Sequence, residues 1–507
     1  MPSIDHYLQL LRDGQADAVL DDLNNREPEN GDEVLIRAQA TALMVDPWNP
    51  EARQMLVDII DALEEESEDE EAESDLWHTT MGVAALRLGR MDDAVEHFGH
   101  IEEGSDPRVD AWLEEAFNGV CYFPKMLSFQ ERVAHAWRTF EERRAEIEDY
   151  FHQQQWDEMI GAVELVLSLV FTSPEFEIGR DASDNKFDIV ISPKGDRARL
   201  YPLLYFRDHM PEALQDSWKV TIGHRLAKSD VAALRFDDVD YDYENVKVQL
   251  VEDDSGMSLF MDEGIFPADM PENKRHFVAY LLVSHALSEL AFTKYFDQYV
   301  NLGTLPVKAS EPVMTLVDLP QALVEKGHPL DIKPEDLTDT WQIYRREATE
   351  SKDPDDFVWR SDVLLGRTRA RELISGFYNG DSWHAQALLN DGVMAGYFGF
   401  PNVPGEGDSL SRREAVEEFF AGYPEYCTVV GGAIAVEHLY VDVLIWNMRE
   451  LMPIAGQYFA GREDLPWAFF KPLRFERGIG MTILKNSDRE DQDDENDEGV
   501  EGEEGTA

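Results

Sequence analysis

The residues best suited to hold a metal ion are two histidines near position 100. His97 and His100 lie three residues apart and are followed by Glu102 and Glu103. Residues at this spacing share one face of a helix, so both imidazoles could reach one ion. A zinc site needs further ligands, and none follows in a known pattern. We therefore interpret the two histidines as surface residues and predict no metal ion and no cofactor.

A second chemical set lies on the most apolar stretch of the chain, FVAYLLVSHALSELAF. Ser284, His285 and Glu289 are the residue types of a serine hydrolase triad. The sequence has no GxSxG turn to expose the serine, and adjacent residues on a helix point apart. The spacing favours a buried polar pair of His285 with Glu289, one helical turn later. We predict no catalytic residue here.

Two further motifs lack part of the pattern that they suggest. Counted from Asp238 in DDVDYDYENVKVQ, the sixth and twelfth positions of a calcium loop hold Tyr243 and Gln249 in place of Gly and Glu. The glycine-rich VVGGAI is not followed by the helix that a phosphate loop needs. These patterns indicate an extended edge segment and, at Gly431 and Gly432, a bulge or close strand contact. We predict no cofactor-binding residue in either motif.

Composition excludes some classes of protein. The 507 residues carry 103 acidic and 45 basic side chains, a net charge of −58, so nucleic acid and anionic membranes are disfavoured and basic partners are favoured. A generally acidic proteome would produce the same excess. Cys121 and Cys427 are too few for a disulfide framework, and the first residues lack a signal-peptide pattern. We expect a cytoplasmic protein.

Residues 1–120 are predicted to form short amphipathic helices, and these are the first elements that could position such side chains. The clearest pair is a helical hairpin in which small residues let two helices approach and a large residue packs behind them. Its packing residues are Trp77, Gly82, Gly89, Ala94, Phe98 and Pro107.

This pattern resembles the tetratricopeptide repeat, which has a period of about 34 residues. Trp77 and Pro107 each lie one place off the usual position, and consecutive clean repeats are absent from the sequence. The whole chain is similar to bacterial tetratricopeptide-repeat proteins with an α+β region behind the repeats. The resemblance implies a surface for protein partners and supplies no catalytic residue. An unrelated amphipathic hairpin is the alternative.

The rest of the chain indicates a multidomain α+β fold with mostly antiparallel sheets. A helical connector is expected over 121–172, and two α+β units over 173–303 and 335–485, separated by a linker over 304–334. Both units contain the tripeptide Arg-Ala-Arg before a helix, so we interpret them as diverged copies. Residues 486–507 form an acidic tail too polar to pack.

Taken together, these features predict a non-enzymatic scaffold for protein–protein interaction. Two alternatives stay open. One is an immunity-like inhibitor of a basic toxin or of a nucleic-acid-binding protein, motivated by the acidity of the chain. The other is an enzyme with an unrecognised site in the α+β region, which a deep pocket with convergent polar groups would favour.

Overall fold

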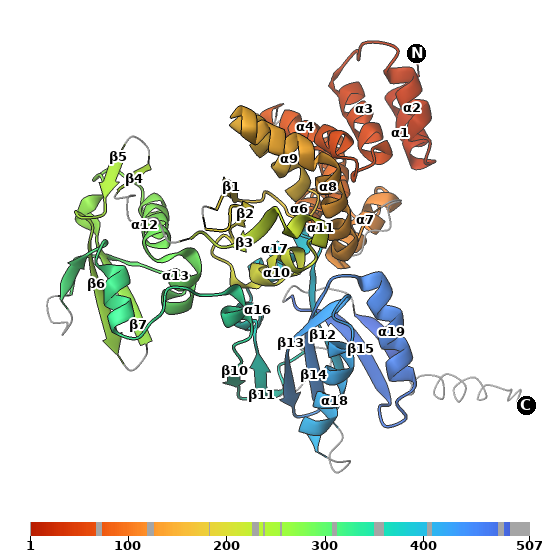
Figure 1. The fold of residues 1–507 in the computed structure, drawn as a ribbon. Helices are drawn as coiled ribbons and strands as arrows, with labels where there is room; N and C mark the ends of the chain where they lie inside the picture. The colour runs from red at the N-terminus through yellow and green to blue at the C-terminus, as the bar shows by residue number, and fades with distance from the viewer. Residues whose placement is uncertain are drawn as a thin grey trace, which may run out of the picture. The chain divides into compact units, whose positions relative to one another are not determined.

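The chain is described by a computed structural model (Figure 1), which covers 2–66, 74–118, 126–181, 183–225, 233–236, 239–253, 256–306, 312–348, 359–402, 408–474 and 481–486. Cys121 and almost all of the predicted tail lie outside the described residues. The chain divides into two compact units. We call Met1–Thr172 with Trp341–Ala507 the terminal unit, and Ser173–Thr340 the middle unit.

Helices make up the first part of the terminal unit, as the sequence predicts. Several begin at a side chain that accepts a hydrogen bond from the backbone of the first turn, among them Ser3, Asn30 and Ser74. Ser128 and Glu131 form the full reciprocal cap expected from their spacing. The helices are α1 (Ile4–Arg12), α2 (Ala16–Leu23), α3 (Gly31–Met44), α4 (Pro50–Glu66), α5 (Asp75–Leu88), α6 (Met91–Gly99), α7 (Pro107–Asn118), α8 (Phe129–Gln153) and α9 (Trp156–Leu167).

A seven-stranded antiparallel sheet forms the second part of the terminal unit, in the order β10-β11-β13-β14-β12-β15-β16. Every residue of β12 and β14 is buried, which explains why these strands are mostly apolar, with His438 and Asp442 of β14 as charged or polar exceptions. The strands are β10 (Gln342–Arg345), β11 (Val363–Thr368), β12 (Met394–Pro401), β13 (Cys427–Ala435), β14 (His438–Ile445), β15 (Trp467–Pro472) and β16 (Thr482–Asn486).

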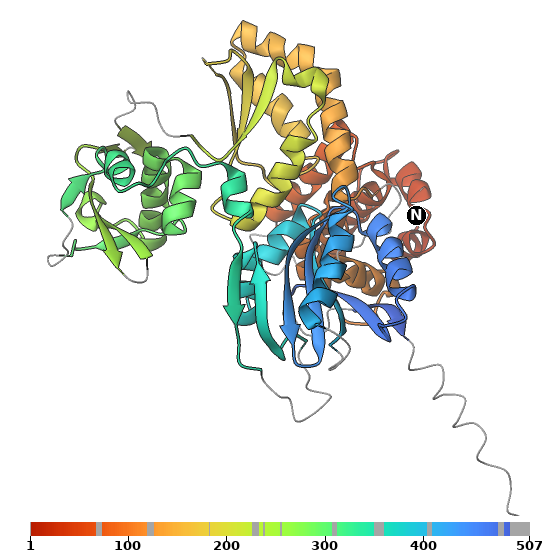
Figure 2. The same cartoon turned by 60° about the horizontal axis from the view of Figure 1, so that its bottom comes forward.

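Four helices pack with this sheet. Helix α18 runs along β13 and β14, and α19 lies beside β16 (Figure 1). The strand pair β10 and β11, teal in Figure 2, forms one edge of the sheet. The helices are α16 (Arg371–Asn379), α17 (Trp383–Asn390), α18 (Ser409–Ala421) and α19 (Met448–Ala460).

Helices α4 to α7 share one hydrophobic core with the seven-stranded sheet, whereas α1, α2 and part of α3 form a separate apolar cluster around Tyr7 and Val19. The shared core joins Trp77 and Phe98 of the helices to Phe398 and Val441 of the sheet. Polar contacts follow the same seam, since the side chain of Asn390 bonds both the backbone and the carboxylate of Asp92 at 3.1 Å. The sequence predicts separate domains at 1–120, 121–172 and 335–485. In the structure all three belong to the terminal unit, because these segments bury apolar faces against one another.

The middle unit holds three small sheets. In the first, β2 pairs with β1 in antiparallel and with β3 in parallel orientation. The others have the orders β4-β5 and β8-β7-β6-β9. The strands are β1 (Phe176–Arg180), β2 (Phe187–Ile191), β3 (Trp218–Ile222), β4 (Ala233–Phe236), β5 (Val239–Asp242), β6 (Lys247–Asp253), β7 (Gly256–Asp262), β8 (Asn301–Gly303) and β9 (Val313–Thr315).

The helices of the middle unit differ from the sequence prediction at one place. The apolar stretch FVAYLLVSHALSELAF predicts a single helix from about Glu272 to Tyr299, but Ser288 has φ +74° and ψ 149°, which no helix accommodates, and it separates two helices. The α-helices are α10 (Leu200–Asp208), α11 (Glu212–Gln215), α12 (Glu272–Leu287), α13 (Glu289–Phe296), α14 (Leu319–Glu325) and α15 (Pro334–Thr338). The 3₁₀ turns are η2 (Arg197–Arg199) and η3 (Glu263–Ile265).

The α+β fold class is confirmed, with helices before the sheets and mostly antiparallel strand pairs. The interpretation of two diverged copies is wrong, because several small sheets in one region and a single sheet in the other do not share a topology. The predicted linker over 304–334 contains β9, which pairs with β6, so part of it completes a sheet. Within the described residues, no helix is long and apolar enough to cross a membrane.

Candidate functional site

Helices α5 and α6 form a closed hairpin around the predicted packing residues. A Cβ atom added to Gly82 would lie 2.5 Å from the ring of Phe98, so only glycine fits beneath this ring. Ala94 and Phe98 are 0% and 1% exposed. Glycine at position 82 thus allows the large side chain of α6 to lie directly on α5.

The ends of this hairpin are formed by the other three predicted residues. Gly89 ends α5 with φ +82°, a backbone conformation that glycine adopts without strain. Pro107 is the first residue of α7, the helix that follows. The indole N–H of Trp77 donates to the carbonyl oxygen of Leu63 at 3.4 Å and so joins α5 to α4.

Helices α3 and α4 leave a groove between them. It has a volume of 340 Å³. The α3 residues that line it recur at helical spacing, as do those of α4, so each helix turns one face to the groove. The lining residues are Val34, Arg37, Ala38 and Thr41 of α3, and Met55, Asp58, Ile59, Ala62 and Leu63 of α4.

Two features distinguish this pair of helices from the closed hairpin. The connection over 45–49 is longer than the two-residue turn at 89–90 of the closed hairpin, and Trp48 from this connection is buried. Arg53 takes the place in α4 that Ala94 has in α6, counted from the first residue of each helix. Its guanidinium donates to the carbonyl oxygens of Leu88 at 3.0 Å and Pro47 at 3.3 Å. The Arg53 side chain therefore ties the start of α4 to the connection before it and to the end of α5.

The groove is apolar inside and acidic along one side. Met55 keeps 47% of its surface exposed although it is a large apolar residue. Asp58 lines the groove, and the exposed Asp61 and Glu65 follow it at spacings of three and four on α4. Such a surface can receive apolar side chains that are flanked by positive charge.

The two histidines of the sequence analysis belong to a cluster with a third. His78 of α5 is buried, stacks on His100 with ring centroids 4.4 Å apart, and approaches His97 with the two Nδ1 atoms 3.4 Å apart. His97 and His100 are thus partners of α5 as well as surface residues. Among the described residues, no group of three or more His, Cys, Asp or Glu is placed to hold a metal ion.

A cavity of 490 Å³ in the middle unit is a second candidate site. It lies at the carboxyl end of β3, where parallel sheets often bind ligands, and His224 lines it. The His224 imidazole contacts the carboxylates of Glu177 at 3.3 Å and Glu175 at 3.7 Å, and their hydrogen bonds raise its pKa to about 10. A protonated imidazole cannot accept a proton, so His224 is unsuited to act as a general base near neutral pH.

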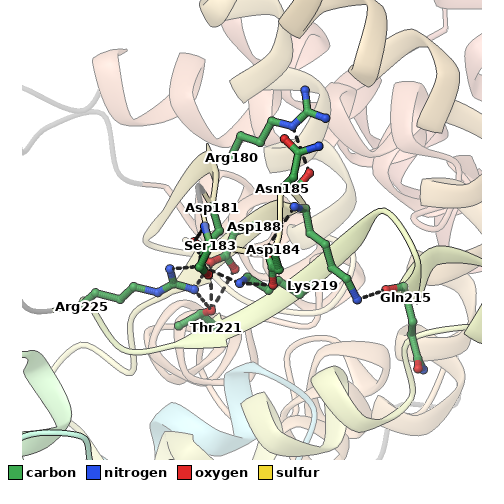
Figure 3. Close-up of polar contacts among 11 residues, drawn as sticks. Arg180, Asp181, Ser183, Asp184, Asn185, Asp188, Gln215, Lys219, Thr221 and Arg225 are labelled. Atoms are coloured by element: carbon green, nitrogen blue, oxygen red, sulfur yellow. Dashed lines mark hydrogen bonds and ion pairs between the residues drawn. The ribbon is translucent and has the colours of Figure 1, made fainter.

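A network of charged side chains fixes the wall of this cavity (Figure 3). Asp181 accepts from Lys219 at 2.6 Å and from Arg225 at 2.7 Å, and Arg225 also pairs with Asp188. The Lys219 ammonium is the largest cause that lowers the pKa of Asp181. Thr221 donates to Asp188 at 2.9 Å. The network ties the turn between β1 and β2 to β3, which is a structural role.

The predicted pair of His285 with Glu289 is wrong. The buried carboxylate of Glu289 accepts from the hydroxyl groups of Ser192 at 2.9 Å and Tyr280 at 3.0 Å, and from the backbone N–H of His224 at 3.0 Å. Two of these donors, Ser192 and His224, follow strands β2 and β3, so sequence spacing along one helix could not identify them.

Three smaller predictions are confirmed. Cys427 lies in the apolar run YCTVVGGAIAV, which predicts an inert core thiol; it is buried, and burial raises the pKa of its thiol to about 12. The strand register shifts between Val429 and Gly431, which is the expected bulge. β5 pairs with β4 alone within the described residues, so Val239–Asp242 is an edge strand.

Comparison with known proteins adds no relative to this description. No family model matches the chain, and neither a curated protein nor a solved structure is significantly similar to it.

Proposed function

We propose that the chain is a non-enzymatic scaffold of the tetratricopeptide-repeat type, which binds a helix or peptide of a protein partner in the groove between α3 and α4. The observation that carries the proposal is the open apolar groove next to a closed hairpin in one helical array. Amphipathic helices bind in such grooves through apolar side chains at helical spacing.

The partner that fits is a basic amphipathic segment. Its apolar face would cover Met55, Ile59 and Ala62, and its Lys or Arg side chains would lie near Asp58 and Asp61. The net charge of −58 would accelerate the encounter with such a partner and repel nucleic acid. In this proposal the protein acts in the bacterial cytoplasm.

The test is affinity capture with the full chain, comparing the wild type with A62W. Ala62 is exposed in the groove wall, so tryptophan would fill the groove without disturbing the core. We expect partners held by the wild type to be lost from A62W, and binding of a purified partner to weaken as salt rises.

The matched control is A145W, which makes the same substitution at an exposed alanine of α8 that does not line the groove. It should retain every partner of the wild type. Identical partner sets for the wild type and A62W would contradict the proposal.

The two alternatives make different predictions. An immunity-like inhibitor would protect cells from a basic toxin in co-expression, and this protection would depend on surface acidity. An enzyme in the α+β region would use the 490 Å³ cavity, so turnover of a substrate lost on changing Ser288, which lines that cavity, would favour it. The pKa of about 10 at His224 speaks against this residue as a general base near neutral pH.

A further inference from the structure

A cavity of 210 Å³ lies at the β10 edge of the seven-stranded sheet, between this strand and α16. Tyr344 of β10 and Arg346, the residue after this strand, line the cavity on one side, and Arg371, Ser375 and Tyr378 follow one another along one face of the helix on the other. All of these residues belong to the terminal unit.

The charge of this cavity is opposite to that of the protein. Arg345, Arg346 and Arg371 line it, and none of its described lining residues is an aspartate or glutamate. In a chain with 103 acidic and 45 basic residues, a cavity with only positive charge is unexpected from composition. The remaining polar lining, which includes Ser375 and Asn379, adds neutral hydrogen-bond donors.

A fully buried arginine holds the aromatic walls in place. Arg360 forms an ion pair with Asp442, and both side chains are 0% exposed. Arg360 also donates to the Tyr344 hydroxyl at 2.9 Å, and its carbonyl oxygen accepts from the Tyr378 hydroxyl at 3.4 Å. Both tyrosines are therefore positioned before any ligand arrives, which lowers the entropic cost of binding.

The same walls position one of the cations. The guanidinium carbon of Arg346 lies 3.7 Å from the ring centroid of Tyr378, a close cation–π contact. Stacking on a tethered ring restricts Arg346 and leaves its N–H groups at the edge of the guanidinium plane available for an oxyanion.

We propose that this cavity binds the phosphoryl group of a small phosphate ester. Arg346 after the strand and Arg371 from the helix supply positive charge from two sides, and Ser375 and Asn379 supply further donors. A phosphoryl group accepts hydrogen bonds in several directions, which suits this arrangement better than a planar carboxylate. The proposal is independent of the groove between α3 and α4.

The test is isothermal titration calorimetry of the full chain with inorganic phosphate, acetate and an octaglutamate peptide, all at constant ionic strength. We expect saturable binding of one phosphate per chain and none of acetate or the peptide. Binding of acetate or the peptide in place of phosphate would overturn the assignment, as would the absence of saturable phosphate binding.

Substitutions of the cavity residues test whether the phosphate binds in this cavity. R346Q and R371Q should each weaken phosphate binding at least about tenfold, which corresponds to about 1.4 kcal/mol. S375E places a carboxylate in the cavity at an exposed residue, so it should abolish binding while thermal unfolding stays unchanged. The control R144Q removes an exposed arginine of α8 and should bind like the wild type. Unchanged phosphate affinity in R346Q, R371Q and S375E would refute the site.

Discussion

The helix pairs α5–α6 and α3–α4 can be compared residue by residue, but the first is closely packed and the second leaves a groove. The eighth residue of the first helix is Gly82 in one and Ala38 in the other, and the eighth residue of the second helix is Phe98 in one and Val57 in the other. Phe98 lies on Gly82 and closes its hairpin, whereas Ala38 lines a groove. A repeat-like array can thus create a binding surface by leaving one of its hairpins open.

The largest expected effect is on stability. It concerns the eighth residue of the second helix, which is Phe98 in the closed hairpin and Val57 in the open one. F98A should lower the free energy of unfolding of the terminal unit by about 3–5 kcal/mol, because it leaves a cavity under a fully buried ring. V57A removes a half-buried side chain and should cost about 1 kcal/mol or less. Urea unfolding of both variants measures the difference, and equal losses would remove the distinction between closed and open hairpins.

The next largest effect on stability concerns the eighth residue of the first helix, which is Gly82 in the closed hairpin and Ala38 in the open one. G82A should destabilise the terminal unit by about 1–3 kcal/mol through overpacking, less a part regained from the higher helix propensity of alanine. A38L, at the corresponding place in the open hairpin, should change stability by about 0.5 kcal/mol or less. Hydrogen–deuterium exchange over 75–99 reports the closed hairpin. The double variant G82A/F98L should recover part of the loss, and failure to do so would locate the strain elsewhere.

The third effect concerns the hydrogen bonds that join the start of α4 to the end of α5 and to the connection before α4. R53M should cost about 1–2 kcal/mol, because the carbonyl oxygens of Leu88 and Pro47 lose their donor. Thermal unfolding measures the loss. The conservative control R53K keeps the charge with a different donor geometry and should lie between the wild type and R53M. A more stable R53M would mean that burial of this charge outweighs its hydrogen bonds.

The smallest effect is pH-dependent and concerns the start of α3. The hydrogen bonds of Arg26 at 2.6 and 2.7 Å are the main cause that lowers the pKa of Glu33 to about 2 from an ordinary value of 4.5. Because the pKa is lower in the folded state, this stabilisation is complete above pH 4.5 and is lost as the pH falls towards 2. In urea unfolding at pH 6 and pH 3, R26Q should show a weaker pH dependence than the wild type. Parallel pH profiles would contradict the role of this pair.

Local patterns predicted the short helices, the cap at Ser128 and the edge strand near Tyr241, because neighbours in sequence decide these features. The same patterns failed for Glu289 and for the proposed duplication. The partners of Glu289 come from Ser192 and His224, far along the chain, and a shared order of elements does not specify how strands pair.

By itself, the sequence determined the helical character of the first part, the inert Cys427 and the acidity of the chain, since composition and spacing express these directly. Only the tertiary structure decided that helices α4 to α7 share a core with the seven-stranded sheet, that α3 and α4 stand apart, and that Arg346 and Arg371 line one cavity beside the buried Arg360. The physical reason is that such sites depend on contacts between residues distant in sequence, and these form only when apolar faces pack together.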